Sequence, residues 1–547
     1  MAVVQTTQPD KTEVFHLEES DTVVAAATHI EPEVEPVIGL RSWLVMAGVC
    51  FALFSQLFTL TVAGSNVTFI ARDIGGASIA SWIVQASANN AALSNMANVD
   101  DEFGRKPLSV GAPALAFIGS VIAAKASSMS MVISGAVLLG PALATISVVQ
   151  SIAAEIMPMK WRVVSNALAF AGGAFGGIVG SLGGGELASN SPSGWRNIYW
   201  LQAALHLSTV LILYFAYWPL PIQKPHRSLK KFIYDCDPIG SVLYVCGASL
   251  LLLGLNWSGG AYSWGSSHVL APFLTGVVAL ILFGLYEWKG RVDGLIAHEL
   301  FEHGPNFTLS FVGITIEGWI FYGAVTNIIP TEMVNLGFAS TPWDVSLRQI
   351  INTISALLMS LAVINICYAT LTEKQNHAQL AYQVIVGLGQ AGPLTLMIAA
   401  AQLSVPHRYL STATGLCFSG RAIGGAFGSC VLNVIINYRY QENWAPTVGR
   451  AAINAGLSPS SVPKLLHELT TANSTGLHAL VGNNSEIIVA ATSASEGVYA
   501  AAYRIAFAAT IPLTVLATLT CYFLTDMKKR MGNTVEASVE KRPGLTD

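Results

Sequence analysis

The sequence predicts an all-α membrane protein with about 13 to 14 transmembrane helices. Of its 547 residues, 52% are hydrophobic and only 11% are charged, a composition far from that of soluble domains. Apolar runs recur along the chain, and each is long enough to cross a bilayer as a helix of about 20 residues. The short alternating segments of an outer-membrane barrel are a poor match to these unbroken runs.

Each candidate span is one such apolar run. In chain order they are residues 43–70, 79–98, 108–126, 129–153, 163–185, 198–219, 238–257, 268–288, 306–330, 347–370, 379–403, 411–436 and 499–525. The expected organisation follows from them: a disordered cytosolic tail (1–40), an N-terminal transmembrane half (41–220), central linker helices (221–300), a C-terminal transmembrane half (301–527) with an outside loop (437–498), and a cytosolic tail (528–547).

Basic residues predict the orientation of the chain. Loops expected inside carry ten lysines and arginines, whereas the intervening loops up to residue 346 carry three, which favours a cytosolic N-terminus. Asn473 and Asn483 begin N-x-S/T glycosylation sequences in the loop 437–498, and the final tail is basic, so we expect the loop outside and the tail inside. Thirteen crossings contradict that arrangement, because an odd number places the two ends of the chain on opposite sides of the membrane. Either 347–370 does not cross, or one helix between 347 and 403 is missing.

An internal repeat divides the chain into two related parts. The pattern Gly-Gly-Ala-Phe-Gly occurs at 172–176 and again at 424–428, and each copy follows an Ile-Ala-Ala run and then a proline and a basic residue. Many transporters consist of such structural repeats. We therefore expect the two copies to occupy equivalent helices of two similar halves.

Glycines form one face of the predicted helix 163–185. Their spacing of four residues places them in one row along the helix: Gly172, Gly176, Gly180 and Gly184. A row without side chains lets a neighbouring helix approach closely. The row can serve movement of the two helices against each other, or it can serve only the static packing of small residues.

A short charged loop at 95–107, between two candidate spans, resembles the cytoplasmic signature of the major facilitator superfamily. The matching residues are Asp101, Gly104, Arg105 and Lys106, with Ala97 and Glu102 as departures from the pattern. The resemblance implies a secondary transporter with two pseudo-symmetric six-helix halves and, here, extra central helices. A carboxylate and an arginine in such a loop can form a contact that holds one access state and breaks in the other, a conformational latch.

A narrower resemblance rests on four runs. Residues 71–75, 154–162, 195–200 and 421–428 are similar to the fungal trichothecene efflux pump family, and the likeness extends over about residues 40–530. The resemblance implies fourteen helices and drug:proton antiport. Two residues depart from superfamily patterns: Ser181 replaces the proline of the helix-5 antiporter signature, and Ala136 replaces the helix-4 arginine of many proton-coupled exporters. Proton coupling must then use another group or be lost.

Two charged residues lie near the middle of candidate spans, Glu317 and Arg421. Each costs about 2.5 to 3.5 kcal/mol at the centre of a membrane helix, and such residues have a partner or a water-filled cavity. We predict a substrate or proton site there, with Glu317 as the proton carrier. The alternative is a structural pair. Weaker polar candidates are expected to form interhelical hydrogen bonds: Asn89, Asn90, Gln150, His206, Gln383 and Gln390.

Other classes of function have no sequence support. The chain has no metal-binding or nucleophile motif and no phosphate-binding loop, so we expect no enzyme, metal or cofactor and no nucleic-acid partner. The predicted function is proton-coupled efflux of a toxin, drug or secondary metabolite. Siderophore-iron uptake and a degenerate, inactive transporter are the alternatives. The expected partners are the lipid bilayer, a small hydrophobic substrate and protons, and the expected form is a monomer in the plasma membrane, or else in a vesicle or vacuole membrane.

Overall fold

The structure is a computed structural model, and every element that it describes is helical. The described residues are 38–75, 83, 105–189, 193–218, 237–258, 262–291, 294–302, 304–338, 343–344, 347–348, 394–406, 409–470, 476–477, 480, 485–525 and 527. Within these ranges, ten helices are long and apolar enough to cross a membrane. The chain is a multi-pass membrane protein, as predicted.

The N-terminal half contains six described helices and one short 3-10 turn. They are α2 (Leu40–Ile74), α5 (Arg105–Ala124), α6 (Met129–Ala144), α7 (Ile146–Ile156), η3 (Met159–Trp161), α8 (Arg162–Ser189) and α9 (Trp195–Ala216). These helices match the predicted spans of this half, with α6 and α7 forming one span. The predicted span 79–98 lies outside the described residues, apart from Ile83.

The remaining helices form the linker and the C-terminal half. The linker is α11 (Pro238–Ser258) and α12 (Ser267–Gly290). The C-terminal half is α13 (Glu299–Glu302), α14 (Asn306–Gly318), the π-helical segment η4 (Trp319–Ile328), α15 (Ile329–Asn335), the short helix Leu394–Ser404, α19 (Leu410–Asn454), η6 (Pro459–Ser461), α20 (Val462–Thr470) and α22 (Ser485–Tyr522). Most of the predicted spans 347–370 and 379–403 falls outside the described residues.

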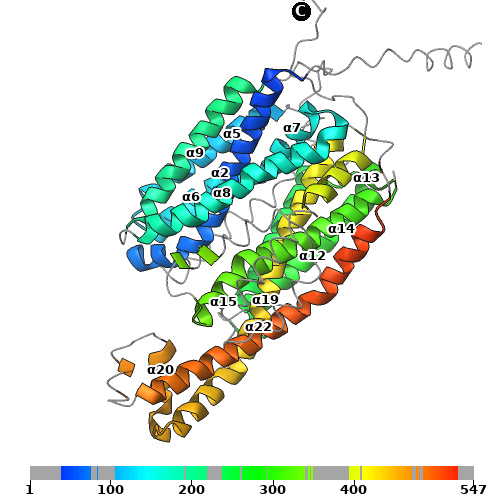
Figure 1. Cartoon of the computed structure of the whole chain (residues 1–547). Coiled ribbons are helices and arrows are strands. Elements are labelled where there is room, and N and C mark those ends of the chain that lie inside the picture. Colours follow the sequence, from blue (N-terminus) through cyan, green and yellow to red (C-terminus); the bar gives the residue numbers. More distant parts are fainter. Residues whose placement is uncertain are drawn as a thin grey trace, which may run out of the picture.

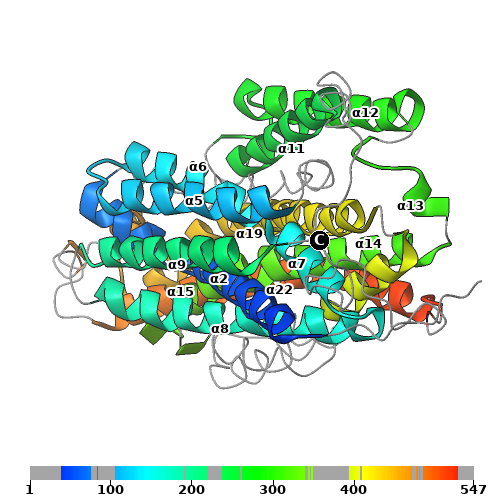
Figure 2. The ribbon, with the colours of Figure 1, turned by 90° about the horizontal axis from the view of Figure 1, so that it is seen from above.

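The two halves lie side by side as separate groups of helices (Figure 1). The linker helices α11 and α12 pair with each other at the edge of the bundle (Figure 2). The hydroxyl groups of Tyr244 on α11 and Ser419 on α19 are 2.8 Å apart in a hydrogen bond. The linker therefore packs on the C-terminal half.

The glycine row of α8 packs directly against α2. A Cβ atom added at Gly172 would lie 2.5 Å from the carbonyl oxygen of Cys50, and one at Gly176 would overlap the Phe54 carbonyl. Gly180 faces Phe58 in the same way, and Gly184 is buried. The row thus brings two backbones into contact, which is the typical use of small residues between membrane helices.

The second copy of the repeat makes the same contact in the C-terminal half. A Cβ atom at Gly424 of α19 would overlap the Thr315 carbonyl of α14, and one at Gly428 would lie 2.8 Å from the Trp319 ring. The helix pair α14/η4 and α19 thus corresponds to α2 and α8. The two copies of the repeat therefore lie in equivalent helix pairs.

The chain enters and leaves the described bundle at one end, which we call the terminal end. Ile38, just before α2, packs on the hydrophobic cluster that contains Leu300 and Phe307. Just after α22, the backbone N–H of Thr525 donates to Asn306 Oδ1 at 2.9 Å, beside the start of α14. An even number of crossings therefore separates the two positions. This parity agrees with one missing or false span among the thirteen, although its predicted place lies largely outside the described residues.

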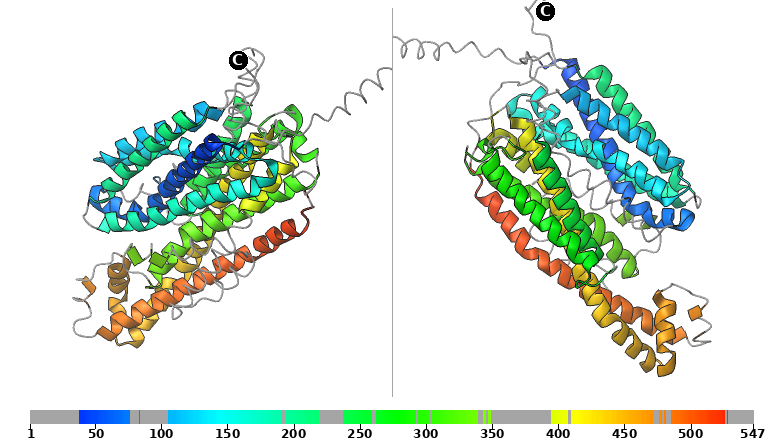
Figure 3. Two further views of the ribbon diagram at one scale, coloured as in Figure 1. Left: turned by 45° about the horizontal axis from the view of Figure 1, so that its top comes forward. Right: turned by 180° about the vertical axis from the view of Figure 1, so that it is seen from behind.

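The prediction of a loop at 437–498 was wrong in its local structure. The described residues there are helical: α19 continues to Asn454, α20 follows, and α22 begins at Ser485. Together they extend beyond the far end, opposite the terminal end (Figures 1 and 3). A small core holds these helices together: Trp444, Val448, Ala452, Leu457, Leu465, Ile487, Ala491 and Val498. The helical spacing of four between Trp444, Val448 and Ala452 predicts this outcome, but the polar composition obscured it.

The glycine contact gives a stability prediction. We expect Gly176→Ala to destabilise the protein by about 1 to 3 kcal/mol, because the new methyl group forces α8 away from the Phe54 carbonyl. Gly183→Ala is the matched control on the same helix, since no atom lies within 4 Å of its Cβ position. Helix propensity alone makes that change neutral or favourable by up to about 1 kcal/mol. Thermal unfolding of the two solubilised variants compares them, and equal melting temperatures would contradict the contact.

Candidate functional site

Glu317 of α14 and Arg421 of α19 form a buried ion pair across the helix contact just described. Arg421 Nε donates to Glu317 Oε2, and Arg421 Nη2 donates to Glu317 Oε1 at 3.0 Å. The two residues are only 1% and 5% exposed. Such two-point pairing fixes orientation as well as distance. The fold thus brings together Glu317 and Arg421, the two residues that the sequence singled out as costly in a membrane. This pairing is the alternative that we considered to a site in a cavity.

Aromatic side chains surround the guanidinium group. Arg421 Nη1 donates to the Tyr322 hydroxyl at 2.9 Å, and the rings of Phe321 and Tyr322 lie 4.9 and 4.8 Å from the guanidinium carbon. Cation–π contacts of this kind stabilise a desolvated cation. Nearby, the indole of Trp319 packs on Phe427, and its buried Nε1–H has no acceptor among the described residues. Sequence reasoning missed these aromatic partners.

The ion pair belongs to the C-terminal half alone. Thr315 and Gly424 occupy the positions of Cys50 and Gly172, so the counterparts of Glu317 and Arg421 are the buried alanines Ala52 and Ala169. The π-helical segment η4 begins two residues after Glu317. Short π-helical insertions are frequent at functional sites. The charged pair and the irregular backbone thus mark the same place in the fold.

A chain of buried hydrogen bonds joins the two halves near the terminal end. Gln150 Nε2 donates to Asn166 Oδ1 at 2.6 Å, and Asn166 Nδ2 donates to Gln402 Oε1 at 3.0 Å. Gln402 Nε2 then donates to Thr414 Oγ1 at 3.2 Å. Arg162 Nη1 also crosses the junction and donates to the Gln402 carbonyl at 3.1 Å. We call these five residues the inter-half junction.

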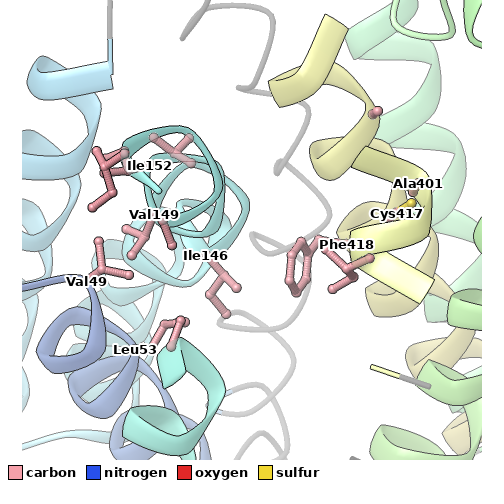
Figure 4. Close-up of a cluster of buried hydrophobic side chains, with 14 of the residues drawn as sticks. Val49, Leu53, Ile146, Val149, Ile152, Ala401, Cys417 and Phe418 are labelled. Atoms are coloured by element: carbon pink, nitrogen blue, oxygen red, sulfur yellow. The ribbon is translucent and has the colours of Figure 1, made fainter. Parts of the chain in front are cut away.

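Apolar side chains pack beside this junction. One hydrophobic cluster contains residues of both halves, among them Val149 and Ile152 from α7 and Ala401 and Cys417 from the C-terminal half. Figure 4 shows Phe418 directed toward Ile146, and the Phe418 ring lies 6.3 Å from that of Phe170. The two halves are therefore closed against each other at the terminal end.

The signature loop is described only from Arg105 onward. Arg105 forms a salt bridge with Glu155 at the end of α7, and Lys106 Nζ lies 3.0 Å from the centroid of the Trp218 ring. The other two latch residues, Asp101 and Gly104, lie outside the described residues. The arginine of the predicted latch is thus engaged, and its described carboxylate partner is Glu155, which the latch prediction did not include.

The two weaker polar candidates that lie within the described residues form interhelical hydrogen bonds. Gln150 contributes to the inter-half junction, and His206 Nε2 lies 3.1 Å from Thr59 Oγ1 between α9 and α2. Ala136 is buried in the apolar core of α6. The other candidates, Asn89, Asn90, Gln383 and Gln390, lie outside the described residues, as do the glycosylation candidates Asn473 and Asn483.

Two of the four runs that resemble the pump family, 71–75 and 195–200, meet at the far end. Asp73 Oδ2 accepts hydrogen bonds from Arg196 Nη1 at 2.7 Å and from Trp195 Nε1 at 2.9 Å. The Arg196 contact, aided by that of Trp195, holds the pKa of Asp73 below its ordinary value. A carboxylate with a lowered folded-state pKa stabilises the fold above its unfolded pKa, and this contribution is lost as pH falls through the folded value. The contact ties the end of α2 to the start of α9.

Sequence reasoning also missed a buried carboxyl on the last helix of the segment that contains Glu317. Glu332 on α15 is 2% exposed. Because it falls just beyond the apolar run 306–330, it gave no signal as a mid-membrane charge. No group of three or more His, Cys, Asp and Glu side chains suited to a metal ion occurs in the part of the chain that the structure describes.

Comparison with known proteins identifies relatives along most of the chain. The MFS-type transporter sphD of Aspergillus fumigatus is 27% identical over 466 residues, which cover 78% of each chain. The trichothecene efflux pump TRI12 of Fusarium sporotrichioides is 21% identical over 514 residues, covering 87% of this chain and 86% of the pump. Among solved structures, the proton:xylose symporter XylE matches with 12% identity and a TM-score of 0.49 over 90% of this chain and 98% of its own.

The sequence model of the fungal trichothecene efflux pump family matches residues 38–347, more than half of the chain. That stretch includes the glycine row, the signature arginine and Glu317. The two repeated halves and the many apolar helices are those expected of a major facilitator transporter. This chain belongs to the fungal trichothecene efflux pump family.

Proposed function

We propose that this protein exports a small hydrophobic toxin or secondary metabolite in exchange for protons, by alternating access. Family membership supports transport, and the relatives, which include efflux pumps of Fusarium species, support export. No step of this cycle needs covalent chemistry by the protein, so its role is transport rather than catalysis.

The inter-half junction is the observation that carries the proposal. Alternating access requires the two halves to separate at one end while they close at the other. Here the halves meet through amide side chains, one hydroxyl and one arginine, all of which can form equivalent hydrogen bonds with water. Separation exposes the junction to water and leaves no buried group unsatisfied, so the closed state can open at low cost.

The Glu317–Arg421 pair is the proposed substrate and proton site. Breaking a buried ion pair by removing one partner costs about 3 to 5 kcal/mol, so the pair opens only when something replaces the lost interaction. A substrate hydroxyl can donate to the Glu317 carboxylate beside Arg421, and a proton on Glu317 removes that acceptor and releases the substrate. Because proton and substrate exclude each other at this carboxyl group, their fluxes are coupled as an exchange.

The surroundings of the pair favour one class of substrate. Phe321, Tyr322, Trp319 and Phe427 offer aromatic surface, and the indole N–H of Trp319 is available for an acceptor. Sites of this composition bind ligands with an apolar body and a few oxygen acceptors. A compact apolar metabolite that carries hydroxyl, ester or ether oxygens meets that description.

The terminal end is proposed to face the cytosol of a monomer in the plasma membrane. The excess of lysine and arginine in the loops at that end supports this orientation. The far end, with the helical extension of α19 and α22, then faces outside, where the sequences at Asn473 and Asn483 are open to glycosylation.

Transport by inside-out yeast vesicles tests the function. We expect a radiolabelled trichothecene to accumulate in vesicles that contain the protein when their lumen is acidic, and the accumulation to collapse with a protonophore. Vesicles without the protein are the control. Uptake of a labelled ferric siderophore into whole cells, without trichothecene accumulation, would support import instead, and transport of neither compound would contradict the proposal for this substrate class.

Substitutions at the ion pair test coupling. Glu317→Gln is expected to abolish accumulation driven by the proton gradient and to preserve substrate binding, because glutamine keeps an acceptor for Arg421 but cannot exchange a proton. Arg421→Ala is expected to damage binding and folding together, since it leaves Glu317 buried without its cation. Glu302→Gln, at an exposed glutamate of α13, is the control. Wild-type, gradient-dependent export by Glu317→Gln would place the proton site elsewhere.

Substitutions at the signature arginine test the latch. Arg105→Ala removes the salt bridge to Glu155 and is expected to reduce transport at least about tenfold, the effect of a shift of about 1.4 kcal/mol between access states, with expression nearly intact. Asp101→Asn is expected to act in the same direction. Lys125→Ala, just beyond the opposite end of the same helix, is the control. A well-expressed Arg105→Ala variant with wild-type transport would rule out this role.

A further inference from the structure

The C-terminal half contains a second buried carboxyl, Glu332, in a different environment from Glu317. It lies on α15, fifteen residues after Glu317 along the same continuous helical segment. Its neighbours Ile329 and Met333 are fully covered in a hydrophobic cluster with Ile436 of α19. The carboxyl oxygen Oε2 has no hydrogen-bond partner among the described residues.

The described residues around Glu332 provide no buried cation. On α22, which packs on α15, the titratable groups on this side are Glu496, Tyr499 and Tyr503, and Arg504 is exposed. Glu496 lies against Gly337, just after α15. Tyr440 of α19 stacks on Tyr499. Glu317, by contrast, has Arg421 on both of its oxygens.

A carboxylate in such a place is costly unless it is paired and hydrogen-bonded, and ionisable groups inside membrane proteins mark proton or ion pathways. The neutral acid needs no counter-ion. The two carboxyls on this helix are therefore suited to different states: Glu317 is charged and paired, and Glu332 carries a proton.

Resting on the export function proposed above, we propose that Glu332 is a proton-binding site of this transporter. Glu332 holds the proton while Glu317 is paired with Arg421. When the helices move during the change of access, water reaches Glu332, which releases the proton and becomes a carboxylate. The step is the binding and release of one proton by one carboxyl group. This site compensates for the absence of the helix-4 arginine, which is Ala136 here.

Tyrosine side chains offer a route from Glu332 toward the far end. Tyr503 lies on α22, which packs on α15, and its hydroxyl accepts from Asn335 Nδ2 at 2.8 Å. The Tyr503 ring lies 6.3 Å from that of Tyr499, which stacks on Tyr440 at 4.5 Å. Tyr440 also packs against the core of the far-end helical extension. The row places polar hydroxyls between the buried carboxyl and the side proposed to face outside.

Labelling of the wild-type protein tests the site without a transport substrate. Dicyclohexylcarbodiimide, an apolar reagent that adds to protonated carboxyls, is applied to membranes at a series of pH values, and mass spectrometry locates the adduct. We expect an adduct on Glu332 that is lost as pH rises, and none on Glu317 or on the exposed Glu302. An unlabelled Glu332 at acidic pH, or labelling that is equal at all pH values, overturns the proposal.

Variants provide the second test, in proteoliposomes with a radiolabelled trichothecene. Glu332→Gln mimics the protonated acid, so we expect loss of accumulation driven by the pH gradient with retained substrate counterflow, and a flat pH profile. Glu332→Asp keeps an ionisable group and is expected to restore gradient dependence. Glu302→Gln is the control. Full gradient-driven accumulation by Glu332→Gln overturns the proposal.

The two tests separate this site from the transport function. A wild-type protein that does not move the trichothecene contradicts the proposed substrate, and the labelling experiment still decides whether Glu332 binds a proton. If the Glu332→Gln protein does not fold, the labelling of the wild-type protein and the Glu332→Asp variant decide. Transport by Glu332→Asp that does not depend on the pH gradient counts against the site.

Discussion

Backbone-to-backbone contact at glycine is the constraint on which the rest of this fold depends. Membrane helices gain little from the hydrophobic effect when they associate, so close packing of small residues carries much of their affinity. In the N-terminal half this contact joins α8 to α2, and in the C-terminal half it joins α19 to α14 and η4. A Cβ atom added at Gly318 would overlap the backbone carbonyl of Arg421. The same close approach that holds the two helices together thus brings the arginine side chain to Glu317.

The two halves share this packing but not its chemistry. Where the C-terminal half has Glu317 and Arg421, the N-terminal half has Ala52 and Ala169. A buried ion pair adds little net stability compared with a well-packed apolar pair of similar volume, so packing alone does not explain its presence. The pair makes physical sense as a switchable contact, since protonation or a competing ligand changes its energy much more than it changes that of two alanines.

The closed junction at the terminal end shows how a membrane protein can hold two bodies together reversibly. Apolar contacts such as that of Phe418 lie beside the junction, and Gln150, Asn166 and Gln402 form a buried chain of hydrogen bonds in which Gln150 Oε1 has no partner among the described residues. When the halves part, water replaces each of these bonds, so the polar part of the junction costs little in either state. A junction of charged pairs alone would be slower to open, because each charge would lose its partner before water reached it.

The sequence by itself determined the properties that depend on local composition and spacing. Apolar runs of bilayer length fixed most of the helices, the repeated glycines fixed the equivalence of two helix pairs, and the insertion cost of charge singled out Glu317 and Arg421 before their contact was visible. Only the tertiary structure decided which side chains are partners and which are alone. Gln402 and Asn166 are 236 positions apart, the isolation of Glu332 depends on what α22 and α19 place around it, and the helices within 437–498 are held by a core built from distant segments. Spacing along one helix reports the face a residue occupies, whereas the partner of a buried polar group is set by which distant helix the fold brings to that face.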